Sequence, residues 1–546
     1  MLIGQNNWEL IISRKIVKGD KNKVSLSYTK LGWVALGHIK KTGSNEFNFH
    51  IRENENNELH QLIKESFKLD DMGVVNPKIC KDDRRAYSLL ENTTKLNSQG
   101  SNWETGLLWK EEERYFPDSY QMAANSSDKF YLPHFAVYNP NKPGKLRVVF
   151  DAAAKSKGVS LNDRLLTGPD LYNSLLGMIF KFRQYEIAFT ADIQEMFLQI
   201  RIIDDDTPFQ LFLWRGKDRK VAPSVYVMKS MIFGAKSSPC SAQFVKNKNA
   251  EQFLSQYPQA VEAIKTKHYM DDYLDSVNSL DNAKKLIKDI MYIHAQGGFN
   301  ITSWASNAPE ALEHVPIAHR SKDVVCFEQS EINMQRTLGL QWDPNSDTLS
   351  FDLSFKKIHP DIISGKQRPT KRQMLKVIMT IFDPPGFLAP LTVRSKILLQ
   401  NVWRSGTDWD NKLNDRNFNE WLLWLEELKT ISNVQIPRYY EILCKDVHEK
   451  AVERQLHIFC DASEKAMCCV AYSRVKNSSG QVFVNFIASK TRVAPIKPMS
   501  IPRLELQAAL LGSRLYKSII GSGIKNTKIA FFTYLVKMRS LLFNYK

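Results

Sequence analysis

Two adjacent aspartates, Asp271 and Asp272, lie in the stretch KHYMDDYLDS between short runs of apolar and aromatic residues. The runs on either side predict two β-strands, so the pair falls at the tip of a hairpin. Adjacent carboxylates repel each other, and side chains alternate across a strand, so neighbouring acids normally point to opposite faces. A sharp turn would let at least one of them meet a carboxylate from another segment. The stretch therefore predicts either a solvated turn or a cation site.

The candidate partner is Asp192, which ends the predicted strand YEIAFTAD just before a helical turn. Three carboxylates at one point could bind two Mg²⁺ about 4 Å apart, with Mn²⁺ as an alternative ion. Such a metal pair activates a 3′-hydroxyl and neutralises a leaving pyrophosphate. Asp192, Asp271 and Asp272 are therefore the candidate catalytic and metal-binding residues.

The charge balance and the cysteines limit the partners and the compartment. The 75 Lys and Arg residues exceed the 58 Asp and Glu residues, so the net charge is +17. This excess indicates nucleic acid or an anionic membrane surface, although a basic, merely soluble protein would show it too. The seven cysteines form no CxxC pair, which favours a reducing compartment without a zinc site. No secretory signal and no run of about 18 apolar residues is visible, so we expect no membrane partner and a cytoplasmic or nuclear location.

The order of predicted elements indicates an α+β fold. The first roughly 120 residues are polar, with ENENNELH as a solvated loop and KVSLSYTKLGWVALG as strand. Strands are predicted in KLRVVFDA, YEIAFTAD and SVYVMKSMIFG, and LDNAKKLIKDIMYIHAQGG has helical spacing before two glycines. A helical region follows Lys371, and strand signals return at Leu456. The helix in PRLELQAALLGSRLYKSI has a predicted buried stripe of Leu504, Ala508, Leu511 and Leu515.

Several stretches, in order, resemble the motifs of a reverse transcriptase. They are TADIQEMFLQI, MIFGAKSSPCSAQ, YMDD, GGFNITSWASN and TLGLQWD. With YLPHFAVYNPNKPGKLRVVFDAAAKSKGVSLNDRLLTGPDL and IFDPPGFLAP, the chain is similar to the Pol polyprotein of BEL/Pao-type LTR retrotransposons over most of residues 20–530. The resemblance implies a right-hand polymerase (fingers, palm, thumb) followed by an incomplete ribonuclease H-like α/β domain. It implies an RNA-directed DNA polymerase that acts on an RNA and DNA primer–template and deoxynucleoside triphosphates, in an unknown oligomeric state.

The resemblance also implies domain boundaries. They are an aspartic protease remnant at 1–50, a partly disordered linker at 51–125, fingers and palm at 126–345, a thumb or connection at 346–450 and the ribonuclease H-like domain at 451–546. Residues 1–50 lack the Asp-Thr/Ser-Gly of such a protease. The stretch FPDSYQMAANSSDKFYLPHF joins two segments that the family separates by a longer helical one. A degenerate, inactive remnant that binds nucleic acid therefore remains the alternative function.

Roles around the nucleotide carry over by position. Asp192 and Asp271 would hold the ions, with Asp272 as a weaker ligand. Phe197 would exclude a 2′-hydroxyl, unless it is a plain core residue. Arg147 would grip the triphosphate, Lys145 would assist it or stay solvated, and Gly234 would let the backbone approach the nucleotide closely.

Ser303 stands where related sequences often carry a basic residue, which would weaken proton donation. Two further features are expected to be structural: Asp204 to Asp206 as a solvated loop, and His268 as a core residue.

The C-terminal stretches HIFCDASEKAMCCVAYS and IPRLELQAALLGSRL resemble the first strand and a helix of ribonuclease H. The resemblance makes Asp461 and Glu505 the first two of four catalytic acids. Tyr534 stands where the family has the third acid, and the sequence ends at Lys546 before the fourth. We therefore expect Asp461 and Glu505 to be an inert remnant, with ribonuclease H activity lost.

Overall fold

The structure is a computed structural model, and it describes residues 15–17, 25–29, 32–36, 80–97, 100–111, 129–138, 146–216, 220–321, 325–327, 340–351, 355, 358–440, 451–524 and 528–533. The chain divides into two compact units, Met1–His60 and Gln61–Lys546. The smaller unit holds three antiparallel strands in the order β1–β2–β3. They are β1 (Lys15–Val17), β2 (Ser25–Thr29) and β3 (Gly32–Leu36). The strand predicted in KVSLSYTKLGWVALG is thus a pair of strands, and its protease origin stays a prediction.

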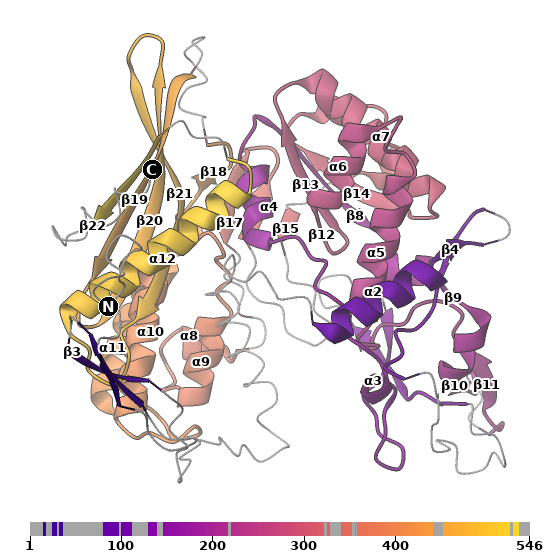
Figure 1. The fold of residues 1–546 in the computed structure, drawn as a ribbon, viewed down its shortest axis with the longest axis horizontal. Helices are drawn as coiled ribbons and strands as arrows, with labels where there is room; N and C mark the ends of the chain where they lie inside the picture. The colour runs from indigo at the N-terminus through magenta and orange to yellow at the C-terminus, as the bar shows by residue number, and fades with distance from the viewer. Residues whose placement is uncertain are drawn as a thin grey trace. The chain divides into compact units, whose positions relative to one another are not determined.

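The larger unit contains an antiparallel sheet of four strands in the order β12–β13–β8–β14. These strands are β8 (Ile187–Ile193), β12 (His268–Tyr269), β13 (Asp272–Val277) and β14 (Ile301–Ser306). The strands predicted on both sides of the acidic pair are confirmed, and they form a hairpin with a two-residue turn. Figure 1 shows β8 between β13 and β14, so β8 is a central strand of this sheet.

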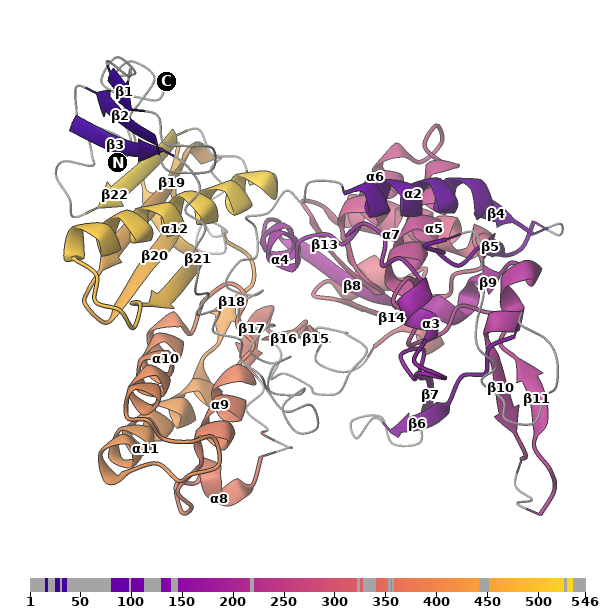
Figure 2. The same ribbon diagram turned by 60° about the horizontal axis from the view of Figure 1, so that its bottom comes forward.

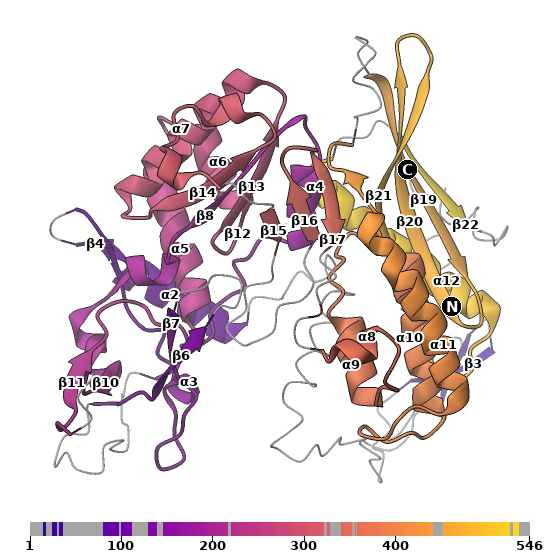
Figure 3. The same ribbon diagram turned by 180° about the vertical axis from the view of Figure 1, so that it is seen from behind.

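Three helices cover one face of the central sheet (Figures 1 and 3). They are α5 (Ser238–Glu251), α6 (Pro258–Thr266) and α7 (Leu280–Gln296). α7 is the helix predicted from helical spacing; Ser279 caps its start and Gly297 follows its last residue. Its buried side chains share an apolar core with Phe189 and Ala191 of β8. Because side chains alternate along a strand, Asp192 lies on the other face of the sheet, away from these helices.

Smaller sheets and helices come before and after β8 in the chain. One sheet has three strands in the order β4 (Lys95–Leu96), β5 (Trp103–Thr105) and β9 (Arg201–Ile202). A second sheet pairs β6 (His134–Tyr138) with β7 (Leu146–Phe150). A third pairs β10 (Leu211–Trp214) with β11 (Ser224–Val227). The helices are α2 (Lys81–Thr93), α3 (Leu161–Arg164) and α4 (Leu175–Phe182). The strands predicted in KLRVVFDA and SVYVMKSMIFG are confirmed as β7 and β11.

The expectation of a solvated loop at Asp204 to Asp206 is wrong for its last residue. These acids begin a 3₁₀ helix, η3 (Asp204–Phe209), and Asp206 is buried. Its carboxylate accepts hydrogen bonds from the Leu107 amide at 2.6 Å and the Trp109 indole nitrogen at 3.0 Å. Two donors compensate the carboxylate for lost hydration, so Asp206 is a structural acid.

The region after the central sheet combines a second sheet with a helical layer. The sheet has the order β15 (Val325–Phe327), β16 (Leu340–Asp343), β17 (Thr348–Phe351) and β18 (Ile436–Pro437). The helices are α8 (Pro360–Ile363), α9 (Lys371–Met379), α10 (Ala389–Arg404) and α11 (Asp415–Thr430). The helical region predicted after Lys371 is therefore confirmed. Trp421 and Trp424 of α11 are fully buried, and they account for the tryptophan-rich pattern of that stretch.

The C-terminal residues form a sheet with one long helix against it (Figure 2). The sheet has the order β21 (Val482–Val493), β20 (Ala466–Asn477), β19 (Ala451–Ala462) and β22 (Lys528–Thr533), with β22 parallel to β19. The helix is α12 (Ile501–Gly521). The predicted stripe is confirmed, because all four of its side chains are buried: Leu504, Ala508, Leu511 and Leu515. The fold is α+β, as the sequence predicts.

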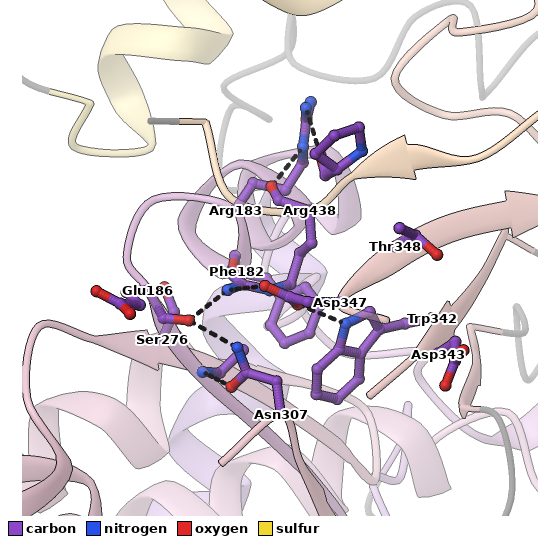
Figure 4. Close-up of polar contacts among 12 residues, drawn as sticks. Phe182, Arg183, Glu186, Ser276, Asn307, Trp342, Asp343, Asp347, Thr348 and Arg438 are labelled. Atoms are coloured by element: carbon purple, nitrogen blue, oxygen red, sulfur yellow. Dashed lines mark hydrogen bonds and ion pairs between the residues drawn. The ribbon is translucent and has the colours of Figure 1, made fainter. Parts of the chain in front are cut away.

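Two buried arginines, Arg183 and Arg438, bond segments that are far apart in the sequence (Figure 4). Arg183 follows α4 and donates to the carbonyls of Arg438 and Ile487 at 3.0 and 3.2 Å. Arg438 follows β18 and donates to the Phe182 carbonyl at 2.6 Å, and it forms a bidentate ion pair with Asp347. Each guanidinium thus has fixed acceptors, which a buried charge requires.

Candidate active site

Asp192, Asp271 and Asp272 converge at one end of the central sheet, on the face opposite to α5, α6 and α7. Each offers a carboxylate oxygen, and these oxygens all lie within 4.8 Å of one another. Asp272 pairs directly with Asp192 across β13 and β8, so both side chains emerge on the same face. All three residues are half-buried. Register alone therefore brings together two acids that are 80 positions apart in the sequence.

The turn of the hairpin brings Asp271 to the other two acids. Met270 has φ +57°, a left-handed conformation that is uncommon for a residue other than glycine. The Asp271 carbonyl accepts a hydrogen bond from the Ile193 amide at 3.0 Å, which fixes the turn to β8. The sharp turn that the sequence required is present.

Two amide side chains that sequence reasoning missed hold this turn. Gln243 of α5 is buried and donates to the Met270 carbonyl at 3.0 Å. Asn173 donates to the His268 carbonyl at 2.9 Å. Gln243 belongs to the quoted stretch MIFGAKSSPCSAQ, but nothing in the sequence shows which carbonyl it meets. Both amides position the acids without being able to react themselves.

A fourth acid of the same stretch, Asp275, is not part of the cluster. It lies three positions after Asp272 on β13, so its side chain faces the opposite side of the sheet. Its carboxylate is buried, forms an ion pair with Lys267 and accepts a hydrogen bond from the Tyr273 hydroxyl at 2.8 Å. Burial, and then the charge of Asp275, raises the pKa of Tyr273 well above its usual value. Asp275 is therefore a structural acid with its own cation.

A buried basic cluster lies behind the hairpin. The His268 ring contacts Tyr273 and His294, with centroids 5.0 and 5.2 Å apart, and Lys246 donates to the Ile264 carbonyl at 3.1 Å. Burial lowers the pKa of Lys246 to about 7, that of His294 to about 4, and that of His268 well below its usual value. Both histidines are therefore neutral near pH 7, and His268 is confirmed as a core residue. The cluster supplies little positive charge to offset three neighbouring carboxylates.

The donor set of the acidic site fits a hard divalent cation. Carboxylate oxygens are the ligands that Mg²⁺ and Mn²⁺ prefer. Among the described residues, this is the only group of three or more acids, histidines or cysteines whose ligand atoms lie within 4.8 Å of one another. Three acids at this separation repel one another strongly unless a cation lies among them.

A cavity of about 250 Å³ opens directly beside Asp192. It is lined by Asp192, Gln194, Thr302, Ser303, Ala318, His319 and Arg320. Ser303 has φ +57° at an irregularity where β14 shifts its register against β8. Of these lining residues, sequence analysis singled out Asp192 and Ser303, because nothing local shows that His319 and Arg320 return to β14.

The residues expected to contact a nucleotide have different surroundings. Phe197 lies in a 3₁₀ helix, η2 (Met196–Gln199); it is buried, and its ring packs on Phe233 with centroids 4.8 Å apart. Gly234 has φ +121°, and a Cβ there would lie 1.9 Å from the Phe150 carbonyl oxygen, so any side chain would collide with β7. Arg147 pairs with Val137 in the sheet of β6 and β7. Lys145 lies outside the described residues. The roles of these residues toward a nucleotide stay predictions.

The comparisons with known proteins concern the C-terminal part of the chain most directly. Residues 370–534 match the family model described as the Pao retrotransposon-like RNaseH-like domain. This segment is Pao-like. The resemblance expected from the sequence is thus confirmed here, and the Pao-like segment begins within the helical region, at the residue before α9. No curated protein matches the sequence.

Solved structures that match the chain include two of the foamy viral protease–reverse transcriptase. The first, in complex with an RNA/DNA hybrid, is 15% identical with a TM-score of 0.49, and the likeness covers 88% of this chain and 58% of that one. The second, in complex with double-stranded DNA, is 15% identical with a TM-score of 0.47, and covers 89% of this chain and 76% of that one. The chain thus spans less than two thirds of the first of these structures.

Two acids meet within the Pao-like segment, at its central strand. Asp461 lies near the end of β19, and Glu505 lies in the first turns of α12 and is buried. Burial, and then the charge of Asp461, raises the pKa of Glu505. Tyr534 lies outside the described residues. The expectation that these two acids are inert stays a prediction.

Proposed function

We propose that the chain is an RNA-directed DNA polymerase that adds deoxynucleotides to a primer on a template. The convergence of Asp192, Asp271 and Asp272 at one end of the central sheet carries this proposal. Three carboxylates at one point suit the two divalent ions that nucleotidyl transfer uses.

The three acids have distinct tasks in this proposal. Asp192 and Asp271 hold two Mg²⁺ ions, and Asp272 contributes a weaker interaction. When bound, the ions supply activation of the primer 3′-hydroxyl and charge neutralisation of the leaving pyrophosphate. The sheet register and the Met270 turn orient the carboxylates in advance, so little reorganisation is needed during the reaction.

The nucleic-acid partner follows from charge. A net charge of +17 favours phosphate contacts that release counterions, so binding is nearly independent of sequence and weakens with salt. None of the described helices is long and apolar enough to cross a membrane. Arg147 would contact the triphosphate, and Gly234 would let the loop after β11 approach it.

A primer-extension assay on the full chain with Mg²⁺ and deoxynucleotides tests the proposal, with Asp271→Asn as the matched control. Extension by the parent chain and its loss in Asp271→Asn are expected. A chain that binds primer–template in a salt-dependent manner, yet extends nothing with Mg²⁺ or Mn²⁺, would instead be an inactive nucleic-acid-binding protein. Binding that does not change between low and physiological salt would contradict the phosphate-binding surface as well.

A further inference from the structure

The cavity beside Asp192 has walls of opposite charge. Asp192 lies on one side, while His319 and Arg320 line it from a different segment. Polar side chains of Gln194, Thr302 and Ser303 complete most of the lining. A volume of about 250 Å³ is several times the roughly 30 Å³ that one water molecule occupies in the liquid. The space is therefore large enough for a polar group of several heavy atoms.

The backbone fixes the basic wall against the central sheet. The short 3₁₀ helix η5 (Ile317–His319) ends at His319, and Arg320 then pairs in parallel with Trp304 of β14. The Ser321 amide donates to the Trp304 carbonyl at 2.8 Å, which extends this pairing. Trp304 is fully buried in the core of the sheet. His319 and Arg320 are thus part of the sheet edge rather than of an independent loop.

The charge of Arg320 is held in place without being neutralised by an acid. Its Nε donates to the Val315 carbonyl at 2.9 Å, and an Nη donates to the Glu313 carbonyl at 3.3 Å. The Glu313 carboxylate instead pairs with Lys284 and His314. Among the described residues, no carboxylate forms an ion pair with Arg320. A guanidinium fixed by neutral carbonyls keeps its full charge for an anion in the cavity.

His319 lies beside Arg320 in the lining of the cavity. Its Nδ1 is buried and has no hydrogen-bond partner among the described residues. An imidazole N–H can donate a hydrogen bond to a phosphate oxygen, so the ring adds a polar side chain to the basic wall.

We propose that His319 and Arg320 form the binding site for the diphosphate part of the incoming nucleotide and for the pyrophosphate that it becomes. This inference rests on the proposed function, because it assigns the leaving-group side of the same site. In the transfer, the 3′-oxygen bonds to the α-phosphorus, its proton passes to water, and the bond from that phosphorus to the bridging oxygen breaks. The electron pair of the broken bond stays on the pyrophosphate, and Arg320 lies where that growing negative charge is stabilised.

This position also bears on Ser303. Ser303 lines the same cavity but carries no charge, whereas Arg320 supplies a permanent positive charge from the neighbouring segment. The positive charge that related sequences often carry at the position of Ser303 is therefore provided by a different residue. No sequence motif shows this, because the replacement comes from a separate segment 17 positions later.

The test measures inorganic pyrophosphate, as a ligand and as a substrate of the reverse reaction. Calorimetric titration of the full chain with pyrophosphate and Mg²⁺ gives its affinity, and primer shortening gives the half-saturating pyrophosphate concentration. We expect Arg320→Gln to weaken both at least about tenfold and His319→Gln to weaken both less. Arg320→Lys should retain most of the affinity, because the charge remains. The matched control is Arg416→Gln, which removes a charge from an exposed side chain of α11, and it should change neither quantity.

The outcomes separate this inference from the proposed function. A parent chain that extends no primer contradicts the proposed function, while the calorimetric arm still decides the pyrophosphate site. Equal pyrophosphate affinity in the parent, Arg320→Gln and His319→Gln proteins would overturn the inference. So would an equal loss of primer–template affinity in Arg320→Gln, because the cavity would then hold the nucleic-acid backbone. Thermal unfolding followed by circular dichroism checks folding, and if Arg320→Gln unfolds, Arg320→Lys and His319→Gln carry the test.

Discussion

The central sheet and the C-terminal sheet both present acids near the end of a central strand, and they differ in how the acids are held. On β8 and β13, the register of two hydrogen-bonded strands and one turn fixes three carboxylates. Near the end of β19, Asp461 meets one further acid among the described residues, Glu505, which comes from the packed helix α12. Three carboxylates also offer more oxygen ligands for two hard cations than two do. The comparison therefore favours catalysis at the first site.

The cores behind the two sites also differ. Lys246 and two neutral histidines lie behind the hairpin, whereas buried thiols lie beside Asp461. Burial raises the pKa of Cys460 to about 12 and that of Cys469 further still, so both thiols are protonated and unreactive near neutral pH. Near neutral pH the two histidines and the two thiols are uncharged, and Lys246 is partly protonated.

The largest expected effect is on the rate of primer extension when an acid of either sheet is replaced. Asp271→Asn should lower the rate of primer extension at least about a thousandfold, because losing a metal ligand removes several kcal/mol of transition-state stabilisation. Asp461→Asn, the matched change in the C-terminal sheet, should leave extension unchanged. Single-nucleotide incorporation rates at saturating Mg²⁺ measure both. A similar loss from either change would erase the difference between the sites.

The next effect concerns the positioning of the turn. Gln243→Leu removes the hydrogen bond to the Met270 carbonyl, so the turn that carries Asp271 should shift. A displacement of about 1 Å at a catalytic group lowers rates about a hundredfold, mainly in kcat rather than in KM. Gln243→Glu, which retains the length but not the donor, should behave like Gln243→Leu. Unchanged kcat in both proteins would show that strand register alone is sufficient.

A stability effect tests the buried base behind the hairpin. The folded-state pKa of Lys246 is about 7, below its unfolded value of about 10.4, so the unfolded chain binds more protons between these pH values. The free energy of unfolding should therefore rise by about 2 kcal/mol between pH 7 and pH 9 from this group alone. Lys246→Met should lose that rise and be more stable than the parent at pH 7. Denaturant titrations at the two pH values decide, and an identical pH dependence in both proteins would refute the buried-lysine assignment.

A smaller effect concerns the sugar of the nucleotide. Phe197→Ala should weaken the rejection of ribonucleotides by at least about tenfold if the ring excludes a 2′-hydroxyl. Ratios of kcat/KM for ribo- and deoxynucleotides measure this discrimination, with Phe233→Ala as the control for lost ring packing. Unchanged discrimination in Phe197→Ala would show that Phe197 serves the core alone.

The smallest expected effect is at the second site. The unaltered chain should give no Mg²⁺-dependent cleavage of an RNA–DNA hybrid, because the two acids that the described residues bring together would hold two hard cations poorly. Asp461→Asn should then change nothing. Clear cleavage that Asp461→Asn abolishes would contradict the view that the two sites differ in kind.

Local signals predicted those parts of the fold whose causes are local. The hairpin, α7 and the buried stripe of α12 follow from periodicity and caps within about 20 residues. The convergence of Asp192 on the hairpin could be expected only from the resemblance, because register between distant strands is not written in either strand.

The residues that sequence reasoning missed have partners far away in the chain. Asp206 takes its hydrogen bonds from residues 97 and 99 positions earlier. Gln243 meets a carbonyl 27 positions later, and Arg320 reaches β14 through a loop that no motif covers. A polar residue with a distant partner looks like a surface residue in the sequence, so its task becomes visible only in the folded chain.

Arg183 and Arg438 limit how the two regions that they bond could be exchanged with the corresponding regions of another protein. Arg183, just before β8, needs the Ile487 carbonyl of the C-terminal sheet, and Arg438 needs the Phe182 carbonyl beside it. A chimera that joined residues up to β17 to the C-terminal sheet of another protein would have to supply both acceptors or bury an unsatisfied guanidinium. The two arginines therefore bond the two regions together, and we expect a fragment cut after β17 to lose Arg438 and to unfold more readily than the joined chain.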